Sequence, residues 1–184
     1  MEDVVGRAES KMHASVEVLR KELASIRTGR ASPGILEHLH VDYYGTDTPL
    51  KQLANISVPE PRLLVIQPYD RNAMAGIEKA ILKSDLGMTP NNDGQVIRLA
   101  VPKLTEERRK DLVKVVRKQV EEGRVAVRNI RREANEHLKD LEKAKTLSAD
   151  DDKRAQERLQ KLTDRFIKEL DDVGHAKEAE VMEV

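Results

Sequence analysis

The chain has 184 residues, of which 36% are charged and 2% are aromatic, and its formal net charge is zero. It contains no cysteine, which excludes a disulfide scaffold, thiol catalysis and a zinc site with Cys ligands, and which fits a reducing compartment. No run of about 18 apolar residues is present, and the N-terminus lacks the layout of a signal peptide. We therefore expect a cytoplasmic protein with no membrane partner, built mainly from long solvated helices.

Residues 3–26 have the spacing of an amphipathic helix. This heptad-like pattern predicts a helix that packs against a helical partner. The pattern ends in IRTGRASPG, where Gly29 and Pro33 stop the helix. Its apolar residues recur at intervals of seven, with two more between them: Val5, Met12, Leu19 and Ile26, with Val16 and Leu23.

Between residues 35 and 101 the pattern changes to short segments separated by turn residues. Leu39, Val41 and Tyr43 alternate with polar residues, which predicts a half-buried strand that ends at Gly45. Further strands are expected at residues 53–58, 63–67 and 96–101, and a helix at residues 72–83. We interpret the region as a small α+β domain whose strand order the sequence does not reveal.

The longest helical pattern begins at Thr105, a good N-cap residue, and continues without proline to about Lys145. A last helix is expected from Ser148, which three aspartates follow, towards the C-terminus. The apolar residues of the long helix recur at steps of three and four: Leu112, Val116, Val120, Gly123, Val127, Ile130, Ala134, Leu138 and Leu141.

None of the three helices can bury its apolar stripe alone, so we expect them to form one elongated antiparallel bundle. The predicted fold class is α+β, with a bundle of residues 1–30 and 105–184 and an inserted β/α/β head of residues 31–104. Both connections contain proline, which predicts a hinge of limited freedom and an L-shaped monomer. The hinge candidates are Gly29, Arg30, Ala31, Ser32 and Pro33 in the first connection, and Val101, Pro102, Lys103, Leu104 and Thr105 in the second.

Arginines form a second stripe on the long helix, each one residue after an apolar position and so about 100° further round. Residues 105–132 carry ten Lys or Arg against five acids, whereas residues 140–184 carry nine against thirteen. This asymmetry suggests a surface for a polyanion from which the acidic segment is kept away. The stripe consists of Arg117, Arg124, Arg128 and Arg131.

Residues 124–132 contain no acid, so their arginines repel one another unless a polyanion binds across them. The scarcity of aromatic residues argues against stacking on bases and favours structured RNA, recognised through shape and phosphate. We predict a phosphate-binding surface of Arg124, Arg128, Arg131 and Arg132, to which Arg27 and Arg30 add.

Two other functions are compatible with parts of the sequence. His38, His40 and Asp42 could form a metal triad on one strand face, although alternation alone places polar residues there. No phosphate-binding loop, nucleophile elbow or zinc-protease motif is present, so we expect no enzyme and no cofactor. The arginine stripe could instead meet an acidic protein, which would make the chain a helical protein–protein interaction module.

Five ordered blocks of the chain closely resemble the bacterial ribosome recycling factor (ribosome-releasing factor) family. They are IRTGRASP (26–33), VDYYGTDTPLKQLA (41–54), EKAILKSDLGMTPNNDG (78–94), LTEERRKDLVK (104–114) and RVAVRNIRREAN (124–135). Matches at LTDRFIKEL (162–170) and KEAE (177–180) extend the resemblance over essentially the whole chain.

The resemblance implies a three-helix bundle and a β/α/β domain joined by a flexible hinge, in a shape close to that of tRNA. It implies binding to the post-termination 70S ribosome, mainly through the bundle on large-subunit rRNA. Together with elongation factor G and GTP, such a protein splits the subunits without being an enzyme itself. By motif, the residues implied to contact RNA are Arg27 and Arg30 in RTGR and Arg128, Arg131 and Arg132 in RNIRR.

Overall fold

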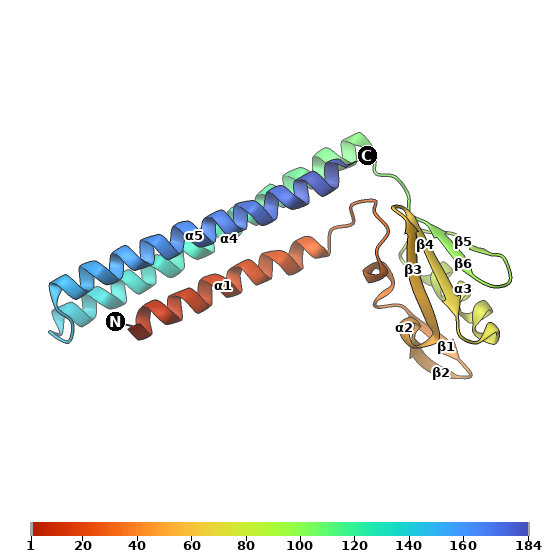
Figure 1. Cartoon of the computed structure of the whole chain (residues 1–184), viewed down its shortest axis with the longest axis horizontal. Coiled ribbons are helices and arrows are strands. Elements are labelled where there is room, and N and C mark those ends of the chain that lie inside the picture. Colours follow the sequence, from red (N-terminus) through yellow and green to blue (C-terminus); the bar gives the residue numbers. More distant parts are fainter. Residues whose placement is uncertain (1, 184) are drawn as a thin grey trace. The chain divides into compact units, whose positions relative to one another are not determined.

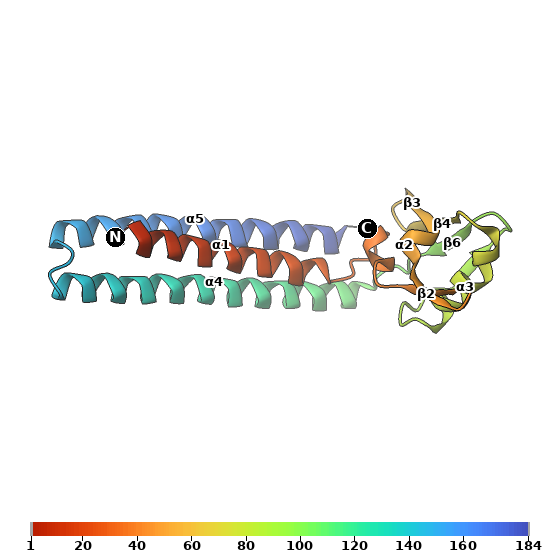
Figure 2. The same cartoon turned by 90° about the horizontal axis from the view of Figure 1, so that it is seen from below.

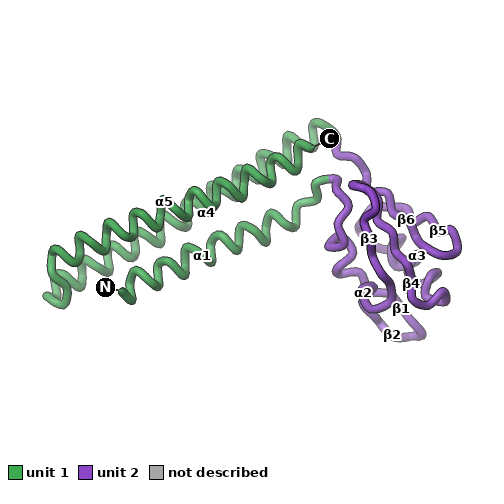
Figure 3. The backbone as a smooth tube through the Cα atoms, in the orientation of Figure 1, with its two compact units in different colours: residues 1–28, 105–184 green, residues 29–104 purple. Residues whose placement is uncertain are grey.

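The structure, a computed structural model, describes residues 2–183 and contains two compact units (Figures 1 and 3). The helical unit takes in the chain up to residue 28 and from residue 105 onward, and residues 29–104 form the head. The head is therefore an insertion between the first and second long helices. The predicted α+β class is confirmed by these two units.

Three long helices make up the helical unit: α1 (Glu2–Ala24), α4 (Glu106–Lys143) and α5 (Ala149–Met182). Helix α4 runs antiparallel to α1 and α5, as Figure 2 shows. Their apolar stripes meet in two clusters of buried residues, which the partly buried Ile130 and Leu162 join. The single phenylalanine, Phe166, is 2% exposed in one of them. The predicted three-helix packing is confirmed.

The two helices that follow the head begin at the predicted N-caps. The Thr105 side chain accepts a hydrogen bond from the backbone N–H of Arg108, and the Ser148 side chain accepts one from that of Asp151. Acidic residues occupy the first turn of both helices, where they complement the helix dipole. Local sequence thus sets where α4 and α5 start.

Two glycines allow α4 and α5 to approach closely. A Cβ built on Gly174 would lie 2.5 Å from Cγ2 of Val120, and one built on Gly123 would lie 3.1 Å from Cδ2 of Leu170. Val120 and Leu170 are both buried core residues. Gly123 therefore stands in the long helix, despite its poor helix propensity, because a larger residue would displace Leu170.

The head contains a two-stranded hairpin and a four-stranded antiparallel sheet of order β3-β4-β6-β5. Helix α3 (Met74–Lys83) and the short helix α2 (Leu50–Leu53) contribute to the same apolar core as the sheet. Two 3-10 turns complete the head, at Pro33–Leu36 and Arg71–Ala73. The strands are β1 (His40–Tyr43), β2 (Thr46–Pro49), β3 (Ala54–Glu60), β4 (Leu63–Pro68), β5 (Pro90–Asn92) and β6 (Ile97–Ala100).

The predicted strands appear as β1, β3, β4 and β6, and the predicted helix as α3. The half-buried strand is confirmed, since Val41 is 0% exposed while His40 and Asp42 are exposed. Strand β1 begins at His40, so placing His38 on the same strand face is wrong. Strands β2 and β5 and helix α2 are not anticipated, because segments of three or four residues carry too little periodicity to recognise.

Both connections to the helical unit are hydrogen-bonded to the β3–β4 turn of the head. The amide of Ala31 donates to the carbonyl of Pro61 at 2.7 Å, and the amide of Val101 donates to that of Arg62 at 2.8 Å. Gly29 has a φ of +78°, and a Cβ there would lie 3.3 Å from Cγ of Leu104. Backbone hydrogen bonds thus hold both ends of the head, at Ala31 and at Val101, against its β3–β4 turn.

Replacing Gly174 by Ala should destabilise the helical unit. The added methyl group overlaps Val120, whose branched side chain has little freedom to move, and such overpacking costs about 1–3 kcal/mol. Gly6 in α1 is the matched control, because a Cβ there meets nothing within 4 Å and helix propensity alone should stabilise by about 0.5–1 kcal/mol. Urea unfolding followed by circular dichroism measures both. Equal stabilities of G174A and G6A would contradict the close approach of α4 and α5.

Candidate nucleic-acid interface

Arginines spaced seven residues apart on α4 face carboxylates spaced seven residues apart on α5. Arg117 Nε donates to Glu178 Oε1 at 3.1 Å, and Arg124 Nε donates to Asp171 Oδ1 at 2.7 Å. The next arginine, Arg131, donates at 2.8 Å to the amide oxygen of Gln160 on α5. We call Arg117, Arg124 and Arg131 with these partners the α4–α5 ladder.

Arg124 is half-buried in the α4–α5 ladder, whereas Arg117 is 69% exposed. The Arg124 side chain is 31% exposed, and it also donates to Glu121 at 2.8 Å, one turn earlier on α4. Hydrogen bonds to Glu121 and to Asp171 raise the pKa of this guanidinium above its usual value. Likewise, the carboxylate of Glu178 raises the pKa of Arg117. Both arginines therefore hold their charge in a contact that joins two helices.

The α4–α5 ladder corrects part of the sequence interpretation. The acidic segment is not kept away from the arginines, because its Asp171 and Glu178 are paired with them. The absence of acids within residues 124–132 also does not leave Arg124 unpaired, since its partners lie at positions 121 and 171. Spacing along α4 reveals neighbours on the same helix, whereas these partners lie on the facing helix.

Arg128 and Arg132 project away from the α4–α5 ladder. Arg128 is 46% exposed and reaches only Glu121, at 3.6 Å. Arg132 is exposed and makes no hydrogen bond or ion pair within residues 2–183. Of the four predicted α4 arginines, these two are the ones whose charge is most available to a ligand, whereas Arg124 and Arg131 are engaged with α5.

Three lysines on α4, which the sequence interpretation did not include, extend the surface of Arg132. Residues 114 and 132 are separated by about five full helical turns and so lie at the same angle around α4. The sequence signal for these lysines is their angular position around the helix, which has to be compared for lysines as well as for arginines. We call the set the basic row, and its members are Lys114, Lys118, Arg128, Arg132 and Lys139, all exposed.

The other two predicted phosphate ligands, Arg27 and Arg30, are both exposed and follow α1. Arg27 belongs to the helical unit and Arg30 to the head. The prediction therefore includes residues of both units.

The described part of the chain brings no three His, Asp or Glu side chains together as metal ligands. His40 Nδ1 lies 3.1 Å from a carboxylate oxygen of Asp47 across the β1–β2 hairpin, and the carboxylate of Asp42 accepts the backbone N–H of Gly45. Two of the three residues considered for a metal triad, His40 and Asp42, are thus engaged in the hairpin. No helix between residues 2 and 183 combines the length and the apolar character needed to cross a bilayer.

Comparison with known proteins gives one consistent family. The family described as Ribosome recycling factor matches residues 19–182. A ribosome-recycling factor from Roseiflexus sp. (strain RS-1) is 62% identical over 182 residues, covering 99% of this chain and 98% of the relative. One from Carboxydothermus hydrogenoformans is 59% identical over 184 residues, covering all of both chains.

Solved structures agree with the sequence relatives. The chain is similar to a solution structure of the ribosome recycling factor, with a TM-score of 0.76 and 49% identity, covering 100% of this chain and 97% of that one. It is also similar, with a TM-score of 0.63 and 50% identity over 99% of this chain and 98% of the other, to a chain in a second structure. That structure is described as models for the T. thermophilus ribosome recycling factor and the E. coli elongation factor G bound to the E. coli post-termination complex.

Replacing Arg124 by Ala should lower the free energy of unfolding by about 1–2 kcal/mol, because partly buried Asp171 loses its charged partner. Replacing Arg132 by Ala should change it by less than about 0.5 kcal/mol, since Arg132 contacts no partner within the described residues. Chemical unfolding of the two variants beside the parent protein tests the difference. A stability loss for R132A as large as that for R124A would show that Arg132 is not the exposed, unpaired arginine described above.

Proposed function

The chain belongs to the ribosome recycling factor family, a family of cytoplasmic, non-enzymatic translation factors, and from this premise we propose how its structure acts. With elongation factor G it acts on the post-termination ribosome. There it splits the subunits and releases mRNA and tRNA for another round of translation. The helical unit holds large-subunit RNA, and the head receives the push of the GTPase.

The observation that supports RNA binding most strongly is the unpaired Arg132 within an acid-free stretch of α4. A folded protein gains little stability from exposed cations aligned on one helix, because like charges repel by a few tenths of a kcal/mol. Phosphates bound along the basic row would reverse this cost and release counterions. Arg27 and Arg30 are included in the proposed surface, and Arg131 borders it.

Arg124 has a different proposed role from the one its place in the sequence suggested. Together with Arg117 it ties α4 to α5, so the basic row is presented on a helix that cannot bend away from its neighbour. A rigid support matters for a factor that transmits force from one partner to another. We therefore assign Arg124 to positioning and the basic row to contact with phosphates.

The energy for splitting comes from the partner, because the sequence has no phosphate-cradling loop of its own. We propose that the head moves relative to the helical unit through short pivots. Ala31 and Val101 are hydrogen-bonded to the β3–β4 turn of the head, and the Thr28 hydroxyl donates to Glu180 in the helical unit. We therefore place the motion between the units in residues 29–30 and 102–105. The remaining predicted hinge residues, among them Ser32 and Pro33, travel with the head.

Replacing Arg132 by Ala should weaken binding to large ribosomal subunits and reduce the slope of log affinity against log salt by about 1, since one phosphate contact is lost. Filter binding or light scattering over a salt series measures both quantities. Lys168→Ala is the matched control, because Lys168 is an exposed cation on α5, outside the basic row. Identical affinities for R132A and the parent protein at every salt concentration would contradict the assignment of Arg132.

Replacing Lys103 by Pro should leave ribosome binding within about twofold and slow subunit splitting at least tenfold. Two consecutive prolines restrict the second pivot to an extended conformation. The amide of Lys103 donates no hydrogen bond to another backbone group within the described residues, so no bond is lost. Light scattering of post-termination ribosomes with elongation factor G and GTP measures splitting, and Lys103→Ala is the control. Full splitting activity in K103P would rule out motion at this pivot.

A further inference from the structure

Ion pairs close two of the three seams between the helices. The α4–α5 ladder spans one seam, and between the parallel helices α1 and α5 Glu2 pairs with Arg158 at 2.5 Å and Glu9 with Arg165 at 2.8 Å. The α1–α4 seam differs. Its only ion pair among residues 2–183 is Lys11 with Glu133, at 3.9 Å.

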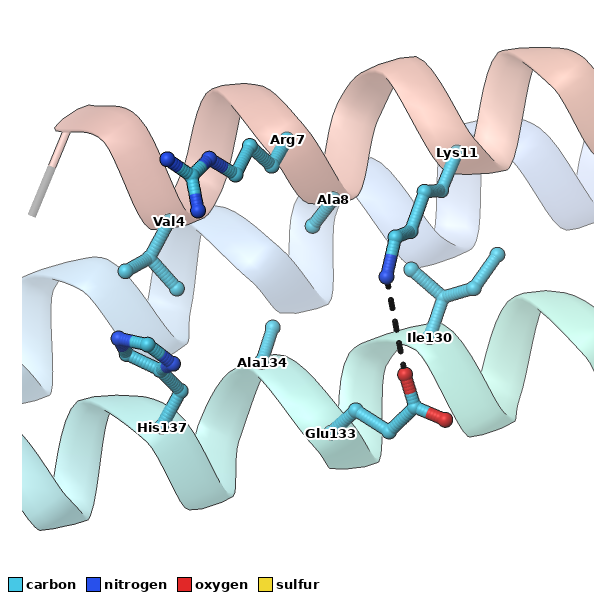
Figure 4. A pocket seen from close by; sticks show the side chains of 8 residues that line it. All are labelled: Val4, Arg7, Ala8, Lys11, Ile130, Glu133, Ala134 and His137. Carbon is cyan, nitrogen blue, oxygen red and sulfur yellow. Dashed lines mark ion pairs between the residues drawn. The ribbon is translucent and has the colours of Figure 1, made fainter.

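Two grooves open along this α1–α4 seam. The first, of about 200 Å³, has Val4, Ala8 and Ala134 among its lining residues (Figure 4). Lys11 reaches Glu133 across it, so its charged rim is already paired between the two helices. This groove therefore offers no unbalanced charge to a partner.

The second groove, of about 170 Å³, lies further along the same seam and has the opposite character. Its apolar lining includes Val18, which is 54% exposed, together with Leu19 and Ala126. Two carboxylates, Glu22 from α1 and Glu122 from α4, also line it. Neither carboxylate forms an ion pair with any residue between 2 and 183.

A third acceptor adds to this acidic groove. The amide oxygen of Gln119 is buried and has no hydrogen-bond partner among the described residues. A buried acceptor without a partner costs about 1–3 kcal/mol, and a donor entering the groove would remove that cost. The groove thus combines an apolar lining, an unsatisfied acceptor and two unpaired negative charges.

We propose that this groove binds a lysine or arginine side chain of a basic protein segment of the ribosome. The aliphatic stem would cover Val18, Leu19 and Ala126, and the cationic head would meet Glu22, Glu122 and the amide oxygen of Gln119. The inference rests on the proposed function for the ribosome as the place of contact. It adds a second, protein-binding surface to the RNA-binding one.

Charge favours a protein over RNA at this surface. Glu122 and Glu133 lie roughly 80–100° around α4 from Arg132, on the side that faces α1, and they would repel phosphates. No lysine or arginine is among the residues that line the groove, whereas two carboxylates are. A polyanion would complement the charge of the basic row, and a basic protein would complement the charge of the groove.

Replacing Glu22 and Glu122 together by Lys tests the proposal. The double variant should bind 70S ribosomes at least tenfold more weakly than the parent protein, because it opposes a cation with two cations. The matched control is the double change Glu157→Lys and Asp172→Lys, which alters the net charge equally at exposed α5 residues without ion pairs in the described structure. Circular dichroism verifies the fold of both variants.

A photo-cross-linking amino acid at position 18 identifies the neighbour on the ribosome. Cross-links to a ribosomal protein, with the tenfold loss in the Glu22/Glu122 variant alone, support the proposal. Unchanged or tighter binding of that variant, or cross-links to rRNA alone, overturns it. Failure of the parent protein to bind ribosomes at all would instead overturn the proposed function, so the two failures are distinguishable.

Discussion

The contact between α4 and α5 is the constraint on which the rest of the helical unit depends. Gly174 and Gly123 let the two helices approach until Val120 and Leu170 fill the space between them. At that spacing Arg117 and Arg124 reach the carboxylates of α5. This pairing neutralises some of the positive charge of α4. Arg124 is half-buried between the helices, whereas the cations of the basic row are exposed.

This arrangement separates two tasks that look identical in the sequence. Arg124 and Arg132 both belong to an arginine stripe, yet one joins helices and the other is exposed without a partner in the described structure. The side of α4 that faces α1 carries Glu122 and opens into a groove with α1. One long helix thereby carries both the proposed polyanion-binding surface and the proposed cation-binding groove. The head, whose two ends are bonded to its β3–β4 turn through Ala31 and Val101, is the part on which the motor is proposed to act.

Much of the fold follows from local patterns. The heptads of α1, the N-caps Thr105 and Ser148 and the alternation around Val41 predict elements that the structure contains. Local patterns do not predict the α4–α5 ladder, because Asp171 lies 47 residues from Arg124 and only the register of the two helices brings them together. The short elements β2, β5 and α2 depend on tertiary pairing and not on periodicity. The groove between α1 and α4 likewise forms only when two distant segments pack.

We propose that the basic row binds ribosomal phosphates and that the α4–α5 ladder only supports it. The most direct measurement is the salt dependence of ribosome affinity for two multiple variants of equal helicity. One replaces the five cations of the basic row by Gln, and the other replaces Arg117 and Arg124. We expect the first to lose most of the salt slope, whereas the second keeps the slope and loses stability. An unchanged salt slope in the basic-row variant would contradict this division of roles. So would the loss of the slope in the variant that lacks Arg117 and Arg124.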